Sequence, residues 1–159
     1  MKAGICVETA DKTDIPALIE LLALLFSIEQ DFCPDPEKQR RGLERLLDAP
    51  ENGVVFVARD MGGDGDCPKN PAIGMASAQL VISTASGAPS AWVEDVVLRP
   101  EYRKMGIGRQ LLAAAAAWAR QKGARRLQLL ADADNTPALA FYARLDWQPT
   151  HLFAWRISV

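Results

Sequence analysis

Two adjacent acids within an apolar run are the first residues with a potential for acid–base chemistry. Glu94 and Asp95 interrupt the segment 92–98, whose other residues favour a β-strand. Strict alternation along a strand would point the two carboxylates to opposite faces, with Trp92, Val96 and Leu98 beside Glu94 and with Val93 and Val97 beside Asp95. If helices cover both faces, at least one carboxylate is partly buried, and its raised pKa makes it a better base near neutral pH. The alternative is that each acid pairs with a basic residue or caps a neighbouring loop.

A basic loop with two glycines follows this strand. Gly106 and Gly108 lack the Cβ atoms that would block a close approach to the backbone, and the helix expected from residue 108 starts beside them with free amide groups. Three neighbours add positive charge: Arg103, Lys104 and Arg109. The loop therefore predicts a phosphate or pyrophosphate site, and the alternative is a solvated basic turn. A dinucleotide fold would need a third glycine at Leu111, and the Gly-Lys-Ser/Thr sequence of a P-loop is absent.

A later helix carries an amide and a phenol seven residues apart. Asn135 is suited to cap this helix, Pro137 falls in its first turn, and Tyr142 lies two turns further on. The phenol of Tyr142 stays protonated at pH 7 and would be able to protonate a leaving group. The alternative is that Tyr142 is a core aromatic residue and Asn135 is only a cap.

The elements that must position these residues follow from hydrophobic periodicity and capping signals. Strands are expected at residues 5–8, 54–59, 73–82, 92–98, 126–131 and 152–159. Helices are expected after Asp14, after Asp35, at 108–122 and after Asn135. The loop 61–71, rich in Gly, Asp, Pro and Asn, would join two antiparallel strands. The order β-α-α-β-β-β-α-β-α-β predicts an α/β (α+β) fold with a mixed sheet flanked by helices.

Composition excludes several other classes of function. With 159 residues and 49% hydrophobic residues, the chain is expected to form a single domain, 1–159. Its three cysteines, Cys6, Cys33 and Cys67, lie far apart and His151 is its one histidine, so neither a metal site nor a disulfide scaffold is expected. A net charge of −2 argues against a nucleic-acid or membrane partner. The start of the chain has no apolar signal region, which favours a cytoplasmic protein.

Three of these motifs, in this order, resemble those of the GNAT superfamily of acyl-CoA-dependent N-acetyltransferases. The run Glu94-Asp95-Val96-Val97-Leu98 is similar to the family's central splayed strand, and Arg103-x-x-Gly106-x-Gly108 is similar to its pyrophosphate loop. The third motif, Asn135-x-x-Ala138-x-x-Phe141-Tyr142, is similar to its late helix. The resemblance covers nearly the whole chain and implies a GNAT-like, mostly antiparallel sheet and acetyl-CoA as cosubstrate.

The resemblance also implies roles for particular residues. The pantetheine arm would lie beside 96–98 and the diphosphate on 104–109, so the cofactor-binding residues would be Val96, Val97, Leu98, Arg103, Lys104, Met105, Gly106, Ile107, Gly108, Arg109 and Asn135. Transfer to a primary amine would be direct, in a ternary complex. Glu94, with Asp95 as second choice, would take the amine proton, and Tyr142 would protonate the departing thiolate. A backbone N–H near Val97 would stabilise the oxyanion.

The sequence departs from the family pattern at two points. Many members carry a glutamate where this chain has Leu130, so that version of the base is missing. The segment Leu145-Asp146-Trp147 stands where a Leu-Gly-Phe turn is common, which affects the local turn rather than the chemistry.

The resemblance places acceptor recognition in the last strands and in the segment between the first two helices. In the segment between the helices, Glu29 and Phe32 belong to a group of acids around an aromatic ring. This group would attract a cationic small-molecule or peptide amine, such as a polyamine, an amino sugar or a lysine side chain. The alternative for these acids is helix capping. The family's final strands often form a dimer interface, so a homodimer is implied. A non-catalytic CoA-binding module of the same fold is the alternative function.

Overall fold

The computed structural model describes residues 4–62 and 70–159. In these residues one sheet has the strand order β1-β2-β3-β4-β5. Its strands are β1 (Ile5–Thr9), β2 (Gly53–Asp60), β3 (Ala72–Ser83), β4 (Ala88–Leu98) and β5 (Leu127–Leu129). The helices are α1 (Ile15–Ile28), α2 (Pro36–Leu47), α3 (Ile107–Gln121) and α4 (Thr136–Ala143), with short 3₁₀ turns η1 (Lys12–Asp14) and η2 (Pro100–Tyr102). The chain divides into two compact units, 1–128 and 129–159, which are described separately below.

The helix starts mostly follow the expected capping chemistry. Asp35 accepts a hydrogen bond from Lys38 N at 3.2 Å at the start of α2, and Asn135 accepts one from Ala138 N at the same distance at the start of α4. Asp14 is different. The helix expected after Asp14 forms, but the Asp14 carboxylate makes no capping bond to α1 and instead forms an ion pair with Arg59, so the side-chain cap expected from Asp14 is absent.

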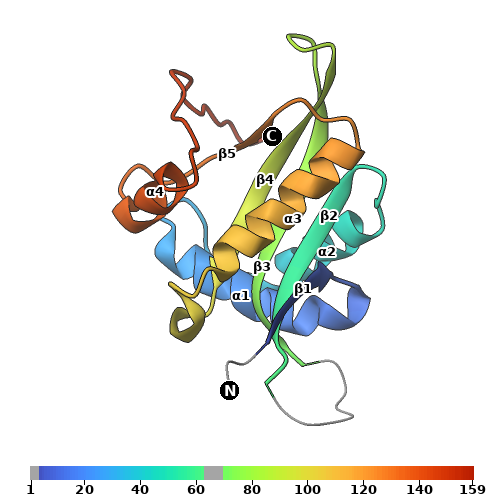
Figure 1. Cartoon of the computed structure of the whole chain (residues 1–159), viewed down its shortest axis with the longest axis vertical. Helices are drawn as coiled ribbons and strands as arrows, with labels where there is room; N and C mark the ends of the chain where they lie inside the picture. The colour runs from blue at the N-terminus through green and yellow to red at the C-terminus, as the bar shows by residue number, and fades with distance from the viewer. Residues whose placement is uncertain (1–3, 63–69) are drawn as a thin grey trace. The chain divides into compact units, whose positions relative to one another are not determined.

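Helices cover both faces of the sheet in the first unit. On one face α1 and α2 pack on Val55, Val57, Met75 and Val97. On the other face α3 packs through Ile107 and Leu111 onto Ala58, Ile73 and Ala76. Figure 1 shows α3 in front of the strands and α1 and α2 behind them. The first four strands pair antiparallel, as expected for the two strands around loop 61–71, and residues 63–69 of that loop lie outside the described residues.

A β-bulge in β4 breaks the alternation expected for the two acids. Ala78 pairs with Val93 and Ala76 pairs with Val96, so Glu94 and Asp95 together lie opposite Ser77. The extra residue shifts the pleat, because Ala76 and Ala78 lie on one face of β3 and therefore bring Val93 and Val96 to the same face. The expected separation of these two valines onto opposite faces is wrong.

The strand expected at 152–159 does not form in the structure. Residues 152–159 have no regular secondary structure, although their apolar side chains alternate as in a strand. A strand exists only when a neighbouring strand satisfies its backbone groups, and among the described residues this segment has no such ladder. Phe153, Trp155 and Ile157 are consequently 86%, 94% and 85% exposed.

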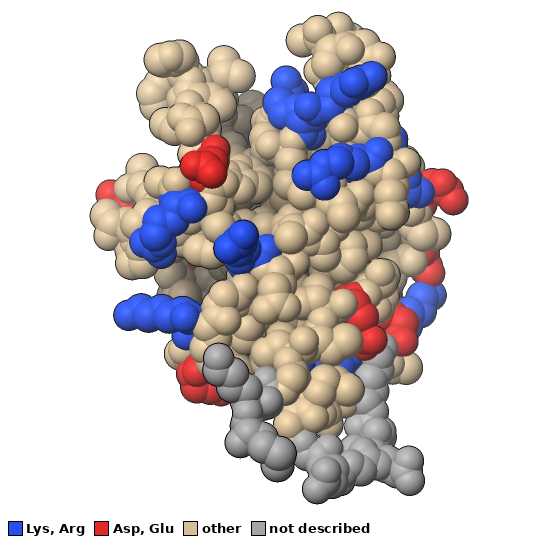
Figure 2. Space-filling view, in the orientation of Figure 1, with Lys and Arg blue, Asp and Glu red and all other residues tan. Residues whose placement is uncertain are grey.

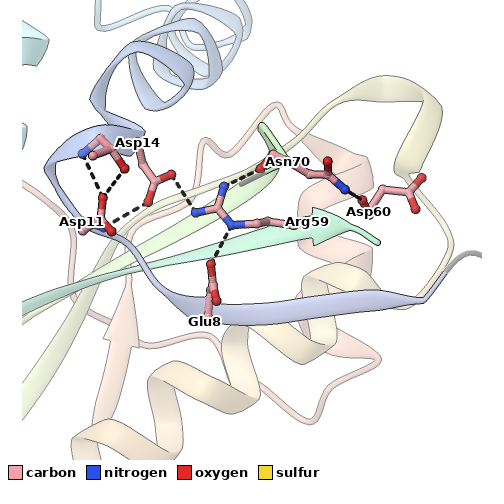
Figure 3. Close-up of polar contacts among 7 residues, drawn as sticks. Glu8, Asp11, Asp14, Arg59, Asp60 and Asn70 are labelled. Carbon is pink, nitrogen blue, oxygen red and sulfur yellow. Dashed lines mark hydrogen bonds and ion pairs between the residues drawn. The ribbon is translucent and has the colours of Figure 1, made fainter. Parts of the chain in front are cut away.

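A buried arginine fixes the start of α1 against the sheet. Arg59, at the irregular end of β2, is only 3% exposed and donates to Glu8 Oε1, Asp14 Oδ1 and Asn70 O, each at 2.6 Å. Figure 3 shows the guanidinium between these three groups. The acids come from β1 and from η1, so the arginine joins three elements through one charge. This network holds α1, which forms one wall of the groove described below.

Candidate functional site

Asp95 lies at the bulge, in a setting that favours proton transfer. Ser77 Oγ donates to Asp95 Oδ2 at 2.6 Å, and the backbone N–H of Asp95 donates to Ser77 Oγ at 3.2 Å. Burial raises the pKa of Asp95, the Ser77 hydrogen bond lowers it and the neighbouring charge of Glu94 raises it, and together these effects bring it from 3.8 to about 6. Glu94 itself is exposed. Of the two predicted carboxylates, Asp95 therefore has the properties of a base that is ionised at neutral pH and ready to accept a proton.

A groove leads to this carboxylate from the α1 and α2 side of the sheet. Its volume is about 430 Å³, within the range typical of small-molecule sites. Leu22 and Phe26 of α1 form part of its lining, and Gln79 and Asp95 contribute from β3 and β4. The remaining lining comes from α2 and the chain that follows it: Lys38, Gln39, Gly42, Leu43, Arg45, Leu46, Ala49, Asn52 and Gly53. The arrangement can hold a small molecule with one group against Asp95.

The basic loop between β4 and α3 has the backbone geometry of an anion site. Lys104 and Gly106 have positive φ values, 63° and 80°, and α3 begins directly after them. The first bond of the helix runs from Gln110 N to Gly106 O, so the helix leaves the amide groups of 107–109 unused. A loop in which residues with positive φ alternate with residues with negative φ turns its backbone N–H groups toward one side. Together with the unused amide groups at a helix start, such a loop forms a concave site for phosphate. Met105 and Arg109 are exposed, whereas Ile107 and Gly108 are buried.

Three contacts anchor this loop to the sheet and to α1. Arg103 Nε donates to Leu98 O at 3.3 Å, and the Tyr102 hydroxyl donates to Asp60 at 3.2 Å. Arg99 forms an ion pair with Glu20 of α1 at 2.7 Å. Lys104 and Arg109 extend from the anchored loop into solvent. Figure 2 shows Lys and Arg side chains at several places on the displayed face, with some of them close together at its upper right.

The structure brings the last residues of β4 next to the predicted loop. Val96, Val97 and Leu98 pair with Ala76, Met75 and Gly74 of β3. The chain that returns from α3 meets β4 near its other end, where Arg125 N donates to Pro89 O and Ala91 N donates to Arg126 O. The residues predicted to lie beside pantetheine therefore follow the bulge directly and precede the phosphate loop.

Asn135 and Tyr142 belong to the second unit, 129–159. The Asn135 side chain caps α4, as expected. The Tyr142 ring packs between Phe141 and Trp147, with ring centroids 5.3 and 5.8 Å away. The carbonyl oxygen of Tyr142 accepts from Leu145 N and Trp147 N, which shapes the turn after the helix. This unit thus presents Tyr142 on an ordered aromatic cluster.

The two predicted acceptor residues lie between α1 and α2. The Phe32 ring is 5.5 Å from the ring of Phe26, which lines the groove, and Phe32 remains 49% exposed. Glu29 is half-buried at the end of α1, where its backbone N–H bonds Leu25 O. Phe32 therefore extends the apolar wall of the groove outward through Phe26.

Ser77 and Gln79 are among the residues of this site that sequence reasoning missed. Ser77, which is fully buried, holds the Asp95 carboxylate, and Gln79 lines the groove. The sequence contained a sign of both residues, because each is a polar residue within the apolar run 73–82. Within residues 4–62 and 70–159 no three metal-ligating side chains cluster together. In the same residues no helix has the length and apolar character needed to cross a bilayer.

Comparison with known proteins identifies the family. The model of the acetyltransferase (GNAT) family matches residues 16–147. An aminoglycoside N(6')-acetyltransferase type 1 of Stenotrophomonas maltophilia is 28% identical over 120 residues, covering 74% of this chain and 73% of the relative. A streptothricin acetyltransferase of Streptomyces lavendulae is 37% identical over 96 residues, covering 57% and 42%.

Solved structures share the fold. An aminoglycoside N-acetyltransferase in complex with CoA matches with a TM-score of 0.81 at 20% identity, over 99% of this chain and 97% of the other. An aminoglycoside acetyltransferase from an uncultured soil metagenomic sample, in complex with sisomicin, matches with a TM-score of 0.74 at 23% identity, over 98% and 96%. The chain belongs to the GNAT family of acetyltransferases and is an N-acetyltransferase that uses acetyl-CoA as cosubstrate.

Proposed function

We propose that this enzyme acetylates a primary amine of a small molecule by direct attack in a ternary complex, with Asp95 as the general base. The observation that carries the proposal is the Asp95 carboxylate at the bulge, which lines a groove of about 430 Å³ and has a pKa of about 6. An aliphatic amine is protonated at neutral pH and must lose a proton before it attacks. Asp95 is preferred to Glu94 because burial raises its pKa, whereas Glu94 faces solvent.

The reaction needs a base, an oxyanion donor and an acid. The amine nitrogen attacks the thioester carbonyl carbon, and its proton passes to Asp95 directly or through a water. The backbone N–H near Val97 would stabilise the negative oxygen that forms. The C–S bond then breaks, and Tyr142 would give its proton to the thiolate. No covalent enzyme intermediate is required, so no cysteine takes part.

The loop and the strand before it are proposed to bind the cosubstrate. The amide groups at 107–109 with Lys104 and Arg109 would hold the diphosphate, and the backbone of Val96 to Leu98 would pair with the pantetheine arm. Asn135 would act through the position of α4, since its side chain serves as the cap. A ligand that binds the native state must raise its stability. A thermal-shift titration should therefore respond to acetyl-CoA and CoA but not to NAD, and an unmoved Tm with excess acetyl-CoA would contradict this assignment.

The proposed acceptor is a cationic amine of the amino-sugar kind. The aminoglycoside N(6')-acetyltransferase relative, at 28% identity over most of its length, supports this class. Glu29 and Phe32 would face the acceptor at the outer end of the groove, where Phe32 packs on Phe26. A panel of amines assayed for CoA release tests the class. Faster turnover of neutral or anionic acceptors than of amino sugars would refute it.

A homodimer formed through the C-terminal segment is proposed as the assembly. Phe153, Trp155, Ile157 and Val159 alternate along the chain and are 85% exposed or more, the pattern of a strand without a partner. A second copy would supply the missing neighbour. Light scattering after gel filtration should give twice the mass of 17.3 kDa, and Trp155→Ser should lower it. A wild-type mass of one chain would exclude the dimer.

A single acetyltransferase domain and a cytoplasmic location are also proposed. The family match at 16–147 extends across both units, which supports one acetyltransferase domain over 1–159. Cys6 and Cys33 are free thiols, which fits a reducing cytoplasm.

A further inference from the structure

Gly42 is an unusual residue for its place in the fold. It lies in the middle of α2 and is exposed, and glycine there lowers helix stability relative to alanine. Its φ is not positive, so no backbone conformation requires a glycine. A Cβ built on Gly42 would meet no atom within 4 Å, so no close packing requires one either. Nothing in the folding of α2 explains this glycine.

A second glycine of the same groove makes the contrast clear. A Cβ on Gly53 would lie 2.3 Å from Leu46 Cδ1, so a side chain at 53 would have to displace Leu46 of α2. Gly42 lines the groove without any such neighbour. The space that its missing side chain leaves is therefore part of the groove itself. Only a molecule that enters the groove would be affected by filling that space.

The groove around Gly42 suits a ring rather than a thin chain. Phe26 of α1 and Leu46 of α2 supply apolar surface, and Asp95 supplies the carboxylate. Three carboxamides that pair with hydroxyl groups also contribute to the lining: Gln39, Asn52 and Gln79. A linear amine would reach Asp95 without using the width of the groove at α2. A hydroxyl-bearing ring would need that width.

We propose that Gly42 determines acceptor specificity by leaving room for the ring of a cyclic, hydroxyl-bearing amine whose amino group reaches Asp95. This inference rests on the proposed function of the groove as the acceptor site. In a site of this kind one added methyl or methylene group changes kcat/KM by about tenfold or more. Larger side chains at 42 should therefore exclude ring-shaped acceptors progressively and leave linear acceptors unaffected.

The test compares Gly42→Ala and Gly42→Leu with Arg41→Leu as the matched control. Arg41 is exposed on the same helix and does not line the groove. Each variant is assayed with glucosamine and with 1,4-diaminobutane. For glucosamine we expect kcat/KM to fall about tenfold in Gly42→Ala and further in Gly42→Leu. For the diamine, for the KM of acetyl-CoA and for Arg41→Leu we expect changes below about twofold, and Gly42→Ala should not lower Tm.

Three results would overturn the inference: an unchanged kcat/KM for glucosamine in Gly42→Leu, equal losses for both amines, or a wild-type enzyme that uses only the diamine. Each of these leaves the acetyl-transfer function intact. Asp95→Asn, measured with the same two amines, tests the proposed base separately, because it should lower kcat by about 10²-fold or more toward both. Full activity of Asp95→Asn would instead refute the proposed base, whatever the Gly42 variants do.

Discussion

Replacing Asp95 with asparagine should stabilise the protein while it removes the proposed base. The native fold raises the pKa of Asp95 because it buries the carboxylate, and it therefore opposes the charged form. Asparagine has nearly the same shape and its side-chain oxygen can still accept the Ser77 hydrogen bond, so the substitution mainly removes the buried charge.

The size of the effect follows from the two pKa values. Between 3.8, the ordinary value, and about 6 in the native state, the folded protein binds more protons than the unfolded chain. The contribution of Asp95 to stability therefore declines as pH rises through this interval and is level above it. At about 1.4 kcal/mol for each pH unit, the full penalty above pH 6 is about 3 kcal/mol. In Asp95→Asn this penalty is absent.

Urea denaturation of the wild type and Asp95→Asn at pH 4 and pH 7.5 measures the difference. We expect the variant to be more stable by up to about 3 kcal/mol at pH 7.5 and nearly equal at pH 4. Glu94→Gln is the matched control, since Glu94 is adjacent but exposed, and its change should stay within about 0.5 kcal/mol. Equal or lower stability of Asp95→Asn at both pH values would refute the argument that this carboxylate is held in an unfavourable environment.

Three further substitutions test other contacts. Ser77→Ala removes the hydrogen bond that lowers the pKa of Asp95, so the fall of kcat at acidic pH should begin at a higher pH than in the wild type. A profile of kcat against pH that matches the wild type would contradict this. Arg59→Met removes the cation that pairs with the buried Asp14 carboxylate and should lower the free energy of unfolding by about 3–5 kcal/mol. Lys12→Ala removes an exposed ion pair and should change stability far less, so similar losses in urea denaturation would count against the network. Tyr142→Phe should lower kcat by about 10²-fold in a CoA-release assay, and unaltered turnover would exclude Tyr142 as the acid.

Most elements of the fold were predictable because local signals and packing agree. Apolar runs on either side of the loop 61–71 marked β2 and β3, and the cap-proline pairs at Asp35 and Asn135 marked two helix starts. The strand expected at 152–159 failed for a reason outside its own sequence. Its alternating apolar residues satisfy the pattern of a strand, but pairing requires a neighbour that the described chain does not provide.

The candidate site was predictable in its residues more than in its geometry. The basic loop could be located because glycine spacing and a helix start are local features. The choice between Glu94 and Asp95 depended on the bulge, which arises from pairing with Ser77, 18 residues earlier in the chain. The pattern of residues within β4 alone therefore does not predict the bulge. Gly42 was missed because a glycine within a helix carries no sign of the open groove beside it.

The dependence of kcat on pH, at saturating acetyl-CoA and amine, tests the central claim most directly. If Asp95 accepts the amine proton, kcat of the wild type should fall below a midpoint near pH 6, and Asp95→Asn should show a kcat lower by about 10²-fold or more without that limb. Wild-type activity that stays level through pH 6, or an Asp95→Asn enzyme with wild-type kcat, would contradict the account.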